Sequence, residues 1–375
     1  PAANAREAAI VNELEVYGVE TLNDVVGFLN GNLTLDPVVI NTREEFYAHL
    51  DEYEFDFSDV KGQENIKRAM EVAAAGGHNM ILIGPPGAGK TMLAKRLPSI
   101  LPPLNLHESL ETTKIHSVAG KLAQQSSLIT VRPFRSPHHT ISDVALVGGG
   151  GNPQPGEISL ANNGVLFLDE LPEFKRTVLE VLRQPLEERS ITISRAKFSV
   201  TYPASFMLIS AMNPCPCGYY NHPEKDCVCA PGVVQRYLNK ISGPLLDRID
   251  IHIEVVPVPF KELHTSRLGE KSADIRKRVI KARQIQEDRY KDKKGIYCNA
   301  QISSKMLREV CYVNEEGHAL LKTAMEKLNL SARAYDRILK VSRTIADLAE
   351  SSDIKTEHLA EAIHYRSLDR ETWGG

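Results

Sequence analysis

The sequence predicts an α/β protein in which helices sandwich a parallel sheet, followed by a helical domain. Apolar runs of strand length occur at 80–83, 165–168 and 206–212, and helical patterns lie between them, as in parallel strands that are buried on both faces. The first run leads into a glycine-rich loop and then a helix. From residue 261 onward only helical patterns remain. With 42% hydrophobic and 25% charged residues, the 375-residue chain has the composition of an ordinary globular protein with a large core.

The loop after the first predicted strand has the spacing G-x-x-x-x-G-K-T. It consists of Gly84, Pro85, Pro86, Gly87, Ala88, Gly89, Lys90 and Thr91. Glycines let backbone N–H groups turn inward around a phosphate, the lysine reaches the β- and γ-phosphates, and the threonine hydroxyl can bind Mg²⁺ at the helix N-terminus. A loop that only connects a strand to a helix would not require lysine and threonine in this order. The loop therefore predicts binding of a nucleoside triphosphate with Mg²⁺.

Polar residues end the second and third predicted strands. Asp169 and Glu170 follow 165–168, and we expect Asp169 to hold Mg²⁺ through its water shell and Glu170 to polarise the attacking water. The third strand is expected beside the second and ends at Asn213, whose amide could orient the same water. A surface strand that happens to end in two acids is the simpler alternative. Together with the loop at 84–91, however, these residues predict hydrolysis rather than binding alone.

Two arginines in the later part of the chain could complete a hydrolytic site. Arg248 lies in the segment LLDRID, and Arg333 lies in SARAYDR. An arginine that neutralises charge on the γ-phosphate can come from a neighbouring subunit, which would make activity depend on assembly. Taken alone, each is more typical of a surface ion pair, with Asp247 or Asp250 as the partner of Arg248.

The order of these motifs resembles that of AAA+ ATPases, and the chain is similar to the magnesium-chelatase-like family, in particular its bacterial YifB/ComM branch. The similarity runs from about residue 55 to the C-terminus and includes the segments RPFRSPHHT (132–140), GEISLA (156–161), LPEF (171–174) and NPCPCG (213–218). The resemblance implies ATP or ADP with Mg²⁺ as ligands. It also implies Lys90 and Thr91 as Walker A, Asp169 and Glu170 as Walker B, Asn213 as sensor 1, Arg248 as a trans-acting arginine finger, and Arg333 as sensor 2 with Arg337 as its rival.

The same resemblance implies a division into domains. Residues 1–54 are expected to be a remnant of an N-terminal Lon-like domain plus a linker, since such a domain precedes the ATPase in this branch and the sequence lacks an initiator methionine. The ATPase core would span 55–260, with a helix-2 insertion at about 132–160, a hairpin at about 190–201 and a cysteine-rich insert at about 214–230. A helical lid would span 261–375, with helices predicted at 275–290, 304–311, 315–328, 332–350 and 356–365.

Four of the six cysteines form two C-x-C pairs that nine residues separate. They are Cys215, Cys217, Cys227 and Cys229. Four thiolates in a loop suit tetrahedral Zn²⁺, although the usual strong signature is the wider C-x-x-C. His222 is a possible substitute ligand. Reduced free thiols and disulfides are the alternatives, and disulfides rank last because a chain without a signal-peptide core is expected in the reducing cytoplasm.

The hairpin expected at about 190–201 carries Arg195 and Lys197 at its tip. In a hexameric ring of identical chains, which the resemblance implies, these cations could contact a nucleic-acid backbone in the central pore. Because the net charge is only −3, any DNA-binding surface must be local, and solvated tip charges are the alternative. His138 and His139 receive no role.

These residues favour an ATP-driven motor acting on DNA, a hexameric helicase or branch-migration translocase of recombination or natural transformation. The alternative is a magnesium-chelatase-type or protein-remodelling ATPase that does not act on DNA. A scaffold that binds nucleotide without hydrolysis is disfavoured by Glu170 and Asn213. No apolar stretch approaches membrane length, so a membrane partner is not expected.

Overall fold

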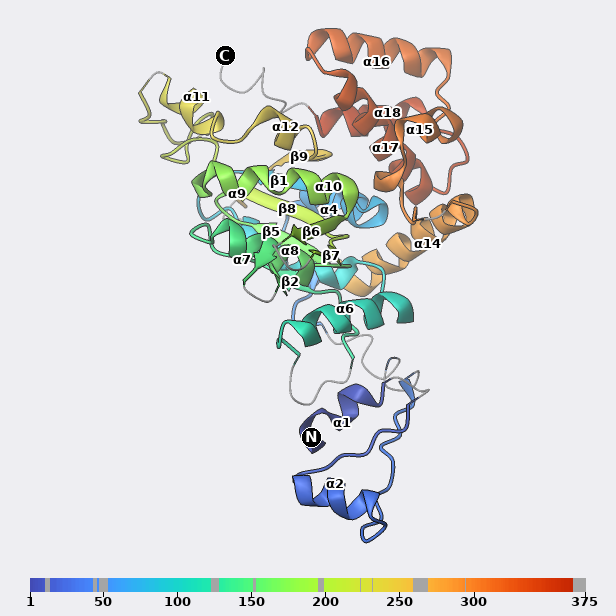
Figure 1. Cartoon of the computed structure of the whole chain (residues 1–375). Helices are drawn as coiled ribbons and strands as arrows, with labels where there is room; N and C mark the ends of the chain where they lie inside the picture. The colour runs from blue at the N-terminus through green and yellow to red at the C-terminus, as the bar shows by residue number, and fades with distance from the viewer. Residues whose placement is uncertain are drawn as a thin grey trace. The chain divides into compact units, whose positions relative to one another are not determined.

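The computed structural model divides the chain into two compact units, which are treated separately below (Figure 1). The smaller unit contains residues 1–53 and 103–132, and the larger contains 54–102 and 133–375. The residues that the structure describes are 1–10, 14–42, 46, 53–122, 128–150, 153–194, 199–222, 224–230, 232–258, 269–293 and 295–366.

The smaller unit contains the helices α1 (Ala2–Ala8), α2 (Leu22–Leu29) and α6 (Leu106–Val118). Helix α6 begins at a capping box, because the Asn105 side chain accepts a hydrogen bond from the Glu108 amide at 2.8 Å and the Glu108 carboxylate accepts one from the Asn105 amide at 3.0 Å. The apolar core of this unit is small and contains Ile10, Phe46, Leu104 and Leu128. The segment 103–132 thus belongs to the same compact unit as residues 1–53.

A five-stranded parallel sheet forms the centre of the larger unit and confirms the predicted fold class. Its central strands are continuous apolar runs because helices cover both faces. The three strands predicted from the sequence are neighbours, with the third lying between the other two. The order across the sheet is β2 (Phe134–Arg135), β5 (Val165–Leu168), β8 (Met207–Met212), β1 (Met80–Ile83) and β9 (Ile251–Glu254).

Alternate residues of the three central strands β5, β8 and β1 contribute to two different apolar cores. In β1, Met80 and Leu82 join the core formed with α4 (Glu64–Gly76) and α5 (Lys90–Arg96). Ile81 and Ile83 join the core on the opposite face. The helices of that second core include α7 (Asp143–Val147), α8 (Glu157–Leu160), α9 (Arg176–Glu180), α10 (Arg183–Glu188), α11 (Val233–Leu238) and α12 (Gly243–Leu246).

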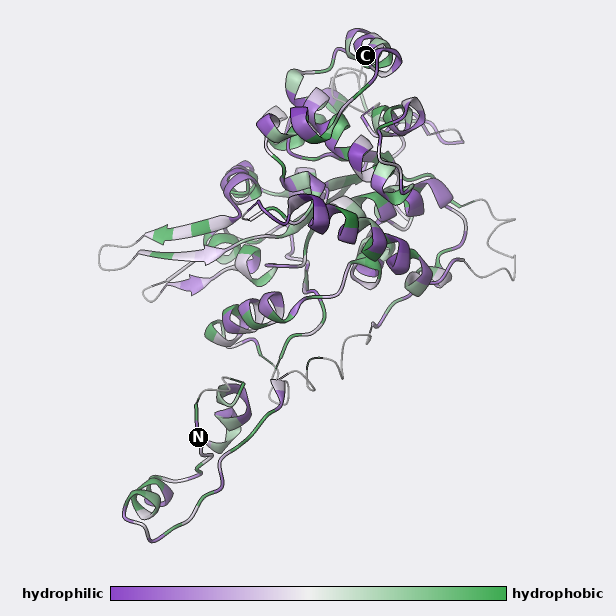
Figure 2. Ribbon diagram, turned by 90° about the vertical axis from the view of Figure 1, so that its right-hand side faces the viewer, coloured by the Kyte–Doolittle hydropathy of each residue, from purple (hydrophilic) through white to green (hydrophobic). Residues whose placement is uncertain are grey.

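A hairpin occurs where the alternating pattern predicts one. Strand β6 (Ser190–Ser194) pairs with β7 (Ser199–Pro203) in antiparallel register, and Ile191 and Ile193 are buried on one face of β6. Figure 2 shows the two strands projecting from the body of the larger unit. The tip, with Arg195 and Lys197, lies outside the described residues, so its DNA-binding role stays a prediction.

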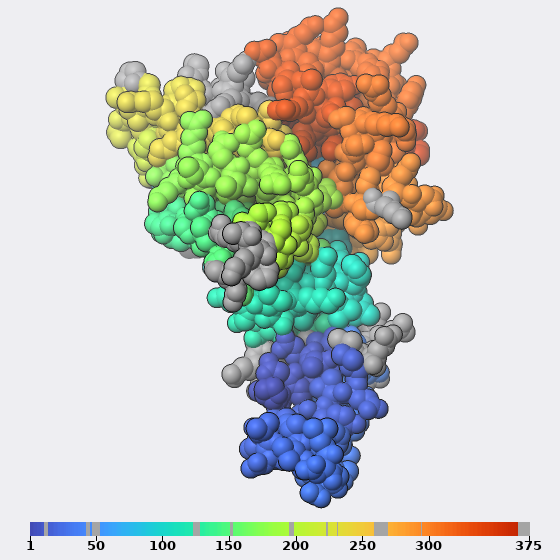
Figure 3. Space-filling model, in the orientation of Figure 1, coloured from blue at the N-terminus to red at the C-terminus, as the bar shows by residue number. Residues whose placement is uncertain are grey.

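Among the described residues after β9, the regular elements are all helices, as predicted. Helices α14 and α17 pack on α4, so the core under the sheet continues into the lid, which is orange to red in Figure 3. Within the described ranges, every helix is too short or too polar to cross a bilayer. The lid helices are α14 (Ser272–Tyr290), α15 (Ser304–Val310), α16 (Glu315–Lys327), α17 (Ala332–Leu348) and α18 (Thr356–His364).

Buried polar side chains also join the sheet to the lid. His78 precedes β1, and its Nε2 lies 2.8 Å from the Thr344 hydroxyl of α17. Its Nδ1 lies 3.4 Å from Asp250, which precedes β9, and Asp250 pairs with Arg337 of α17 at 2.9 Å. Burial lowers the pKa of His78, an effect that the Asp250 carboxylate opposes. Burial would raise the pKa of the same carboxylate, but the charges of Arg337 and Lys340 and the contact with His78 together outweigh burial and hold the pKa below its usual range.

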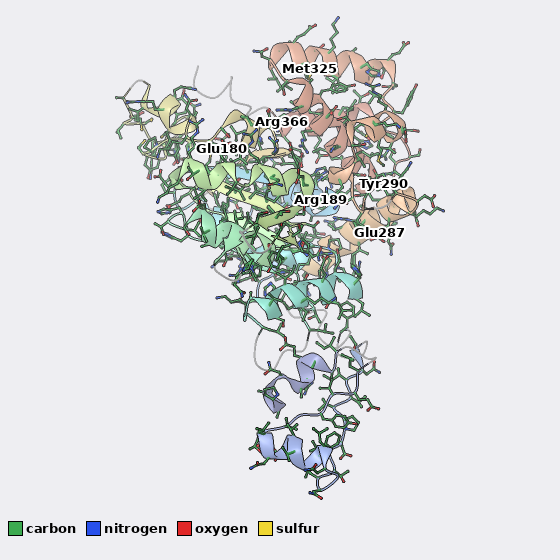
Figure 4. All side chains as sticks on the ribbon, viewed as in Figure 1. Glu180, Arg189, Glu287, Tyr290, Met325 and Arg366 are labelled. Carbon is green, nitrogen blue, oxygen red and sulfur yellow. The ribbon has the colours of Figure 1, made fainter. Side chains whose placement is uncertain are left out.

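This network continues within the lid at Asp347. Its carboxylate accepts hydrogen bonds from Asn299 at 2.8 Å and from Arg289 at 2.5 Å. Asn299 also donates to Thr344 at 3.0 Å and accepts a hydrogen bond from the Tyr290 hydroxyl at 2.7 Å. Tyr290 extends from α14, as labelled in Figure 4. The lid is therefore tied to the sheet by polar as well as apolar contacts.

Candidate active site

The loop between β1 and α5 has a backbone that glycine makes possible. Gly84 lies so close to the neighbouring strand end that a Cβ would be 2.3 Å from the Val255 carbonyl oxygen. Gly89 adopts a φ of 89° immediately before α5, in the left-handed region that glycine tolerates best. These two positions allow the loop to fold over the N-terminus of α5, where backbone N–H groups are available for phosphate oxygens.

Lys90 begins α5, and its ammonium group is buried within the loop. Its Nζ donates hydrogen bonds to the carbonyl oxygens of Gly84 at 2.7 Å and Pro85 at 2.9 Å, and to Asn213 Oδ1 at 3.0 Å. Burial lowers the pKa of Lys90, and the nearby charges of Asp169 and Glu170 oppose that shift. A bound phosphate could therefore replace these oxygens as the partner of the ammonium group.

The strand ends bring together residues that are far apart in the sequence. The Thr91 hydroxyl donates a hydrogen bond to Asp169 Oδ2 at 2.5 Å, and the Glu170 amide donates to Asp169 Oδ1 at 2.9 Å. Asn213 follows β8, which lies between β5 and β1. A hydroxyl and a carboxylate in contact are suitable ligands for Mg²⁺ or its water shell.

Glu170 has a partner that sequence reasoning did not identify. Its Oε2 lies 3.2 Å from Nδ1 of His139, and its backbone adopts a left-handed φ of 53°, which is uncommon for a residue other than glycine. The His139 ring also packs edge-on against Phe174 and lies beside His138. Because β2 pairs with β5, the segment after β2 reaches the acidic end of β5. The only signal in the sequence was the position of His139 in the family-like segment 132–140.

Arg248 forms an ion pair within its own chain, but not with the acids next to it. Its guanidinium binds the Glu187 carboxylate of α10 and donates to the Pro244 carbonyl. The side chain is nearly buried. The simpler alternative, a pair with Asp247 or Asp250, does not occur in this structure, where each of these acids binds an arginine of α17 instead.

The two arginines of α17 differ sharply in environment. Arg333 is 67% exposed and lies 3.3 Å from Asp247. Arg337 is 23% exposed and lies 2.9 Å from Asp250, which is 1% exposed. In the described part of the chain, Arg248 contacts Glu187 and Arg333 contacts Asp247, and neither contacts the loop at Lys90.

The four cysteines of the C-x-C pairs come together after β8. Their Sγ atoms all lie within 4.8 Å of one another. Cys215 Sγ is 3.3 Å from Cys217 Sγ and 3.7 Å from Cys227 Sγ, and Cys217 and Cys227 are 3.5 Å apart. All four thiols are free, which rules out the disulfide alternative in this structure. His222 is not part of the group, and its Nδ1 accepts a hydrogen bond from the Glu224 amide.

Comparisons with known proteins agree with this geometry. Residues 56–263 match the family model described as magnesium chelatase, subunit ChlI, and residues 269–366 match that of the ChlI C-terminal region. The chain is 47% identical over 368 residues to competence protein ComM of Haemophilus influenzae, an alignment that covers 98% of the chain and 71% of that protein. It is 44% identical over 371 residues to the uncharacterized protein YifB of Salmonella typhimurium, covering 98% and 70%. A third relative, the uncharacterized protein Rv2897c of Mycobacterium tuberculosis, is 42% identical over 369 residues, covering 98% and 71%.

Proposed function

Because the chain belongs to the magnesium chelatase ChlI-like family of AAA+ ATPases, in its ComM/YifB branch, we propose that it is an ATP-hydrolysing motor that acts on DNA as a hexameric ring. Its activity would be that of a helicase or branch-migration translocase. The observation that carries the DNA part is the 47% identity to a protein named for competence, the state in which cells take up DNA. The hairpin β6–β7 that projects from the ATPase core supports it.

The nucleotide chemistry follows from the three adjacent strand ends. Lys90 would exchange the carbonyl oxygens of its loop for the β- and γ-phosphates, and Thr91 and Asp169 would hold Mg²⁺, which offsets phosphate charge when bound. Glu170 would accept a proton from the attacking water, and Asn213 would orient that water. His139 would position Glu170 through the contact described above.

The arginines would act from outside this cluster. Arg333 is the better candidate for sensor 2, because it is exposed and only loosely paired, whereas Arg337 is committed to the buried Asp250. Arg248 would serve the active site of a neighbouring subunit as the arginine finger. That role requires Arg248 to exchange Glu187 for the neighbour's γ-phosphate.

DNA would contact the tips of the hairpins. Arg195 and Lys197 would present a ring of cations to the phosphate backbone in the pore, so DNA binding would weaken steeply with salt. The alternative, a chelatase-type or protein-remodelling ATPase that does not act on DNA, is favoured by the family model itself, which describes a magnesium chelatase subunit.

The test is steady-state ATPase activity with and without single-stranded, duplex and branched DNA. The variant is Arg195→Ala/Lys197→Ala. Its matched control is Lys277→Ala/Lys281→Ala, which removes two exposed cations from α14. DNA stimulation that the tip variant loses and the control keeps would support the motor. ATPase activity that none of the DNAs changes, in any of the three proteins, would support the alternative, an ATPase that does not act on DNA.

A further inference from the structure

The described part of the segment that contains the four cysteines has few buried residues and no regular secondary structure. Between β8 and α11, the described residues form neither helix nor strand. Of the described residues between 214 and 230, only Cys215 and Gly218 are buried. A segment without a core of its own requires a cross-link to keep one conformation, and a structural metal ion supplies that free energy in small loops.

The arrangement of the sulfur atoms fits a tetrahedral metal site. With Zn–S bonds of about 2.3 Å, the edges of a ZnS₄ tetrahedron are about 3.8 Å long. The Sγ separations among Cys215, Cys217 and Cys227 are 3.3, 3.5 and 3.7 Å, close to this edge. Four protonated thiols would gain only weak hydrogen bonds from such convergence, and four thiolates would repel one another without a cation. Soft thiolate ligands in a tetrahedron favour Zn²⁺ over Mg²⁺.

The cysteine segment also touches the nucleotide-binding loop. Gly218 follows Cys217 directly, and a Cβ at Gly218 would lie 2.5 Å from Cδ of Pro86. The Gly218 amide donates a hydrogen bond to the Cys215 carbonyl at 3.0 Å, which closes a tight turn around the first C-x-C pair. The backbone of this turn is therefore packed against the tip of the phosphate-binding loop.

A second connection runs through Asn213. This residue lies two positions before Cys215, and its Oδ1 accepts the hydrogen bond from Lys90. Its backbone also lies near the hydroxyl of Tyr237, on the helix that follows the second C-x-C pair. Both ends of the cysteine segment thus lie next to Asn213, whose side chain contacts Lys90.

From this geometry we propose that Cys215, Cys217, Cys227 and Cys229 bind one Zn²⁺, and that the zinc-bound segment supports Pro86 and Asn213 in the conformation that binds nucleotide. Loss of the metal then weakens nucleotide binding without removing any residue of the P-loop. The inference requires only that the P-loop binds nucleotide, and it is independent of an action on DNA.

The metal site is tested by zinc analysis of the purified chain. We expect about one zinc ion per chain in the wild type and in Cys298→Ala, a cysteine outside the cluster, and less than about a tenth of that in Cys217→Ser/Cys229→Ser. Equal zinc in the two variants, or a wild type that retains less than about half an ion after dialysis against zinc, would overturn the site. Should the double variant not fold, release of zinc from the wild type by a thiol-modifying reagent gives the same answer.

The coupling is tested by the affinity for a fluorescent ATP analogue with saturating Mg²⁺. Zinc-stripped wild type should bind about tenfold more weakly than the loaded protein and should recover when zinc is restored. Gly218→Ala should keep its zinc and also bind more weakly, since its methyl group would displace Pro86. The control is Gly232→Ala, because Gly232 has a similar positive φ, 77° against 85° for Gly218, but no atom within 4 Å of its Cβ position. Affinity that is unchanged by stripping, or equal in the two glycine variants, would refute the coupling.

The two tests can fail separately from the proposed motor. Zinc and nucleotide affinity are measured without DNA, so a chain that ignores DNA can still show both effects. Conversely, DNA-stimulated ATPase activity in the zinc-stripped chain at unchanged nucleotide affinity would refute this inference and leave the motor intact.

Discussion

Replacing Arg333 and Arg337 by glutamine, one at a time, tests whether the two arginines have different roles. We expect Arg337 to contribute to stability and Arg333 to be available for catalysis. Arg337 binds Asp250 at 2.9 Å, and Asp250 is 1% exposed. Arg333 binds Asp247 at 3.3 Å at the surface. The two arginines lie one turn apart on α17, so their substitutions are closely matched.

The expected free-energy changes differ severalfold. Removing one partner of a buried ion pair costs about 3–5 kcal/mol because the remaining charge is left unpaired. For Arg337→Gln we expect about 3 kcal/mol, the lower end, because Asp250 still accepts a hydrogen bond from the Asn79 amide and contacts His78. For Arg333→Gln we expect at most about 1 kcal/mol, as for other exposed pairs.

Urea unfolding followed by circular dichroism measures the stability, and steady-state ATPase assays at saturating ATP measure turnover. Arg333→Gln should lower turnover at nearly wild-type stability, whereas Arg337→Gln should lower stability. Adding Asp250→Asn to Arg337→Gln should recover part of the loss, because it removes the unpaired charge. The reasoning is refuted if Arg333→Gln is the more destabilising variant, or if the double variant is no more stable than Arg337→Gln.

Three further predictions concern single side chains. Glu170→Gln should abolish ATP turnover but leave ATP binding, and turnover at the wild-type rate would exclude Glu170 as the base. His139→Ala should lower kcat about threefold to tenfold with little change in KM, because Glu170 loses the partner that orients it; a kcat equal to that of the wild type would contradict this. The folded pKa of His78 lies below the unfolded value, so the unfolded chain takes up the proton first and stability falls by up to about 1.4 kcal/mol per pH unit below about pH 6.5. The free energy of unfolding, measured between pH 7.5 and about 5.5, should show this loss in the wild type and in the control His318→Gln, and a smaller loss in His78→Gln. If stability falls equally with pH in all three proteins, His78 is not the group responsible.

Much of the fold could be predicted because its signals are local. The strands β1, β5 and β8 are apolar throughout except for Ser210, which is the pattern of strands buried on both faces. The lid helices could be placed within a few residues because cap residues mark their starts. The side chains of Asn314 and Ser331, for example, accept hydrogen bonds from the first turns of α16 and α17.

Contacts that depend on the tertiary structure could not be predicted. Asp247 and Asp250 were the partners that the sequence offered for an ion pair of Arg248, but side chains one or two positions apart on a helical turn point in different directions. Its actual partner, Glu187, is 61 residues away in the sequence. The contact between His139 and Glu170 likewise depends on the pairing of β2, a strand of only two residues, with β5. No periodicity can be read from so short a strand.

The polar network around His78 and Thr344 has a mechanical consequence. Sliding the lid over the sheet would separate Asp250 from Arg337 and His78 from Thr344 at the same time, and of these four side chains only Arg337 is partly exposed. Such a movement would cost several kcal/mol, far above the thermal energy of about 0.6 kcal/mol. The sheet and the lid are therefore expected to move together as one rigid body when nucleotide is exchanged. A small movement of the phosphate-binding loop would then move α15 and α16 with it, without being absorbed between the sheet and the lid. Any molecule that contacts these outer helices would feel this movement.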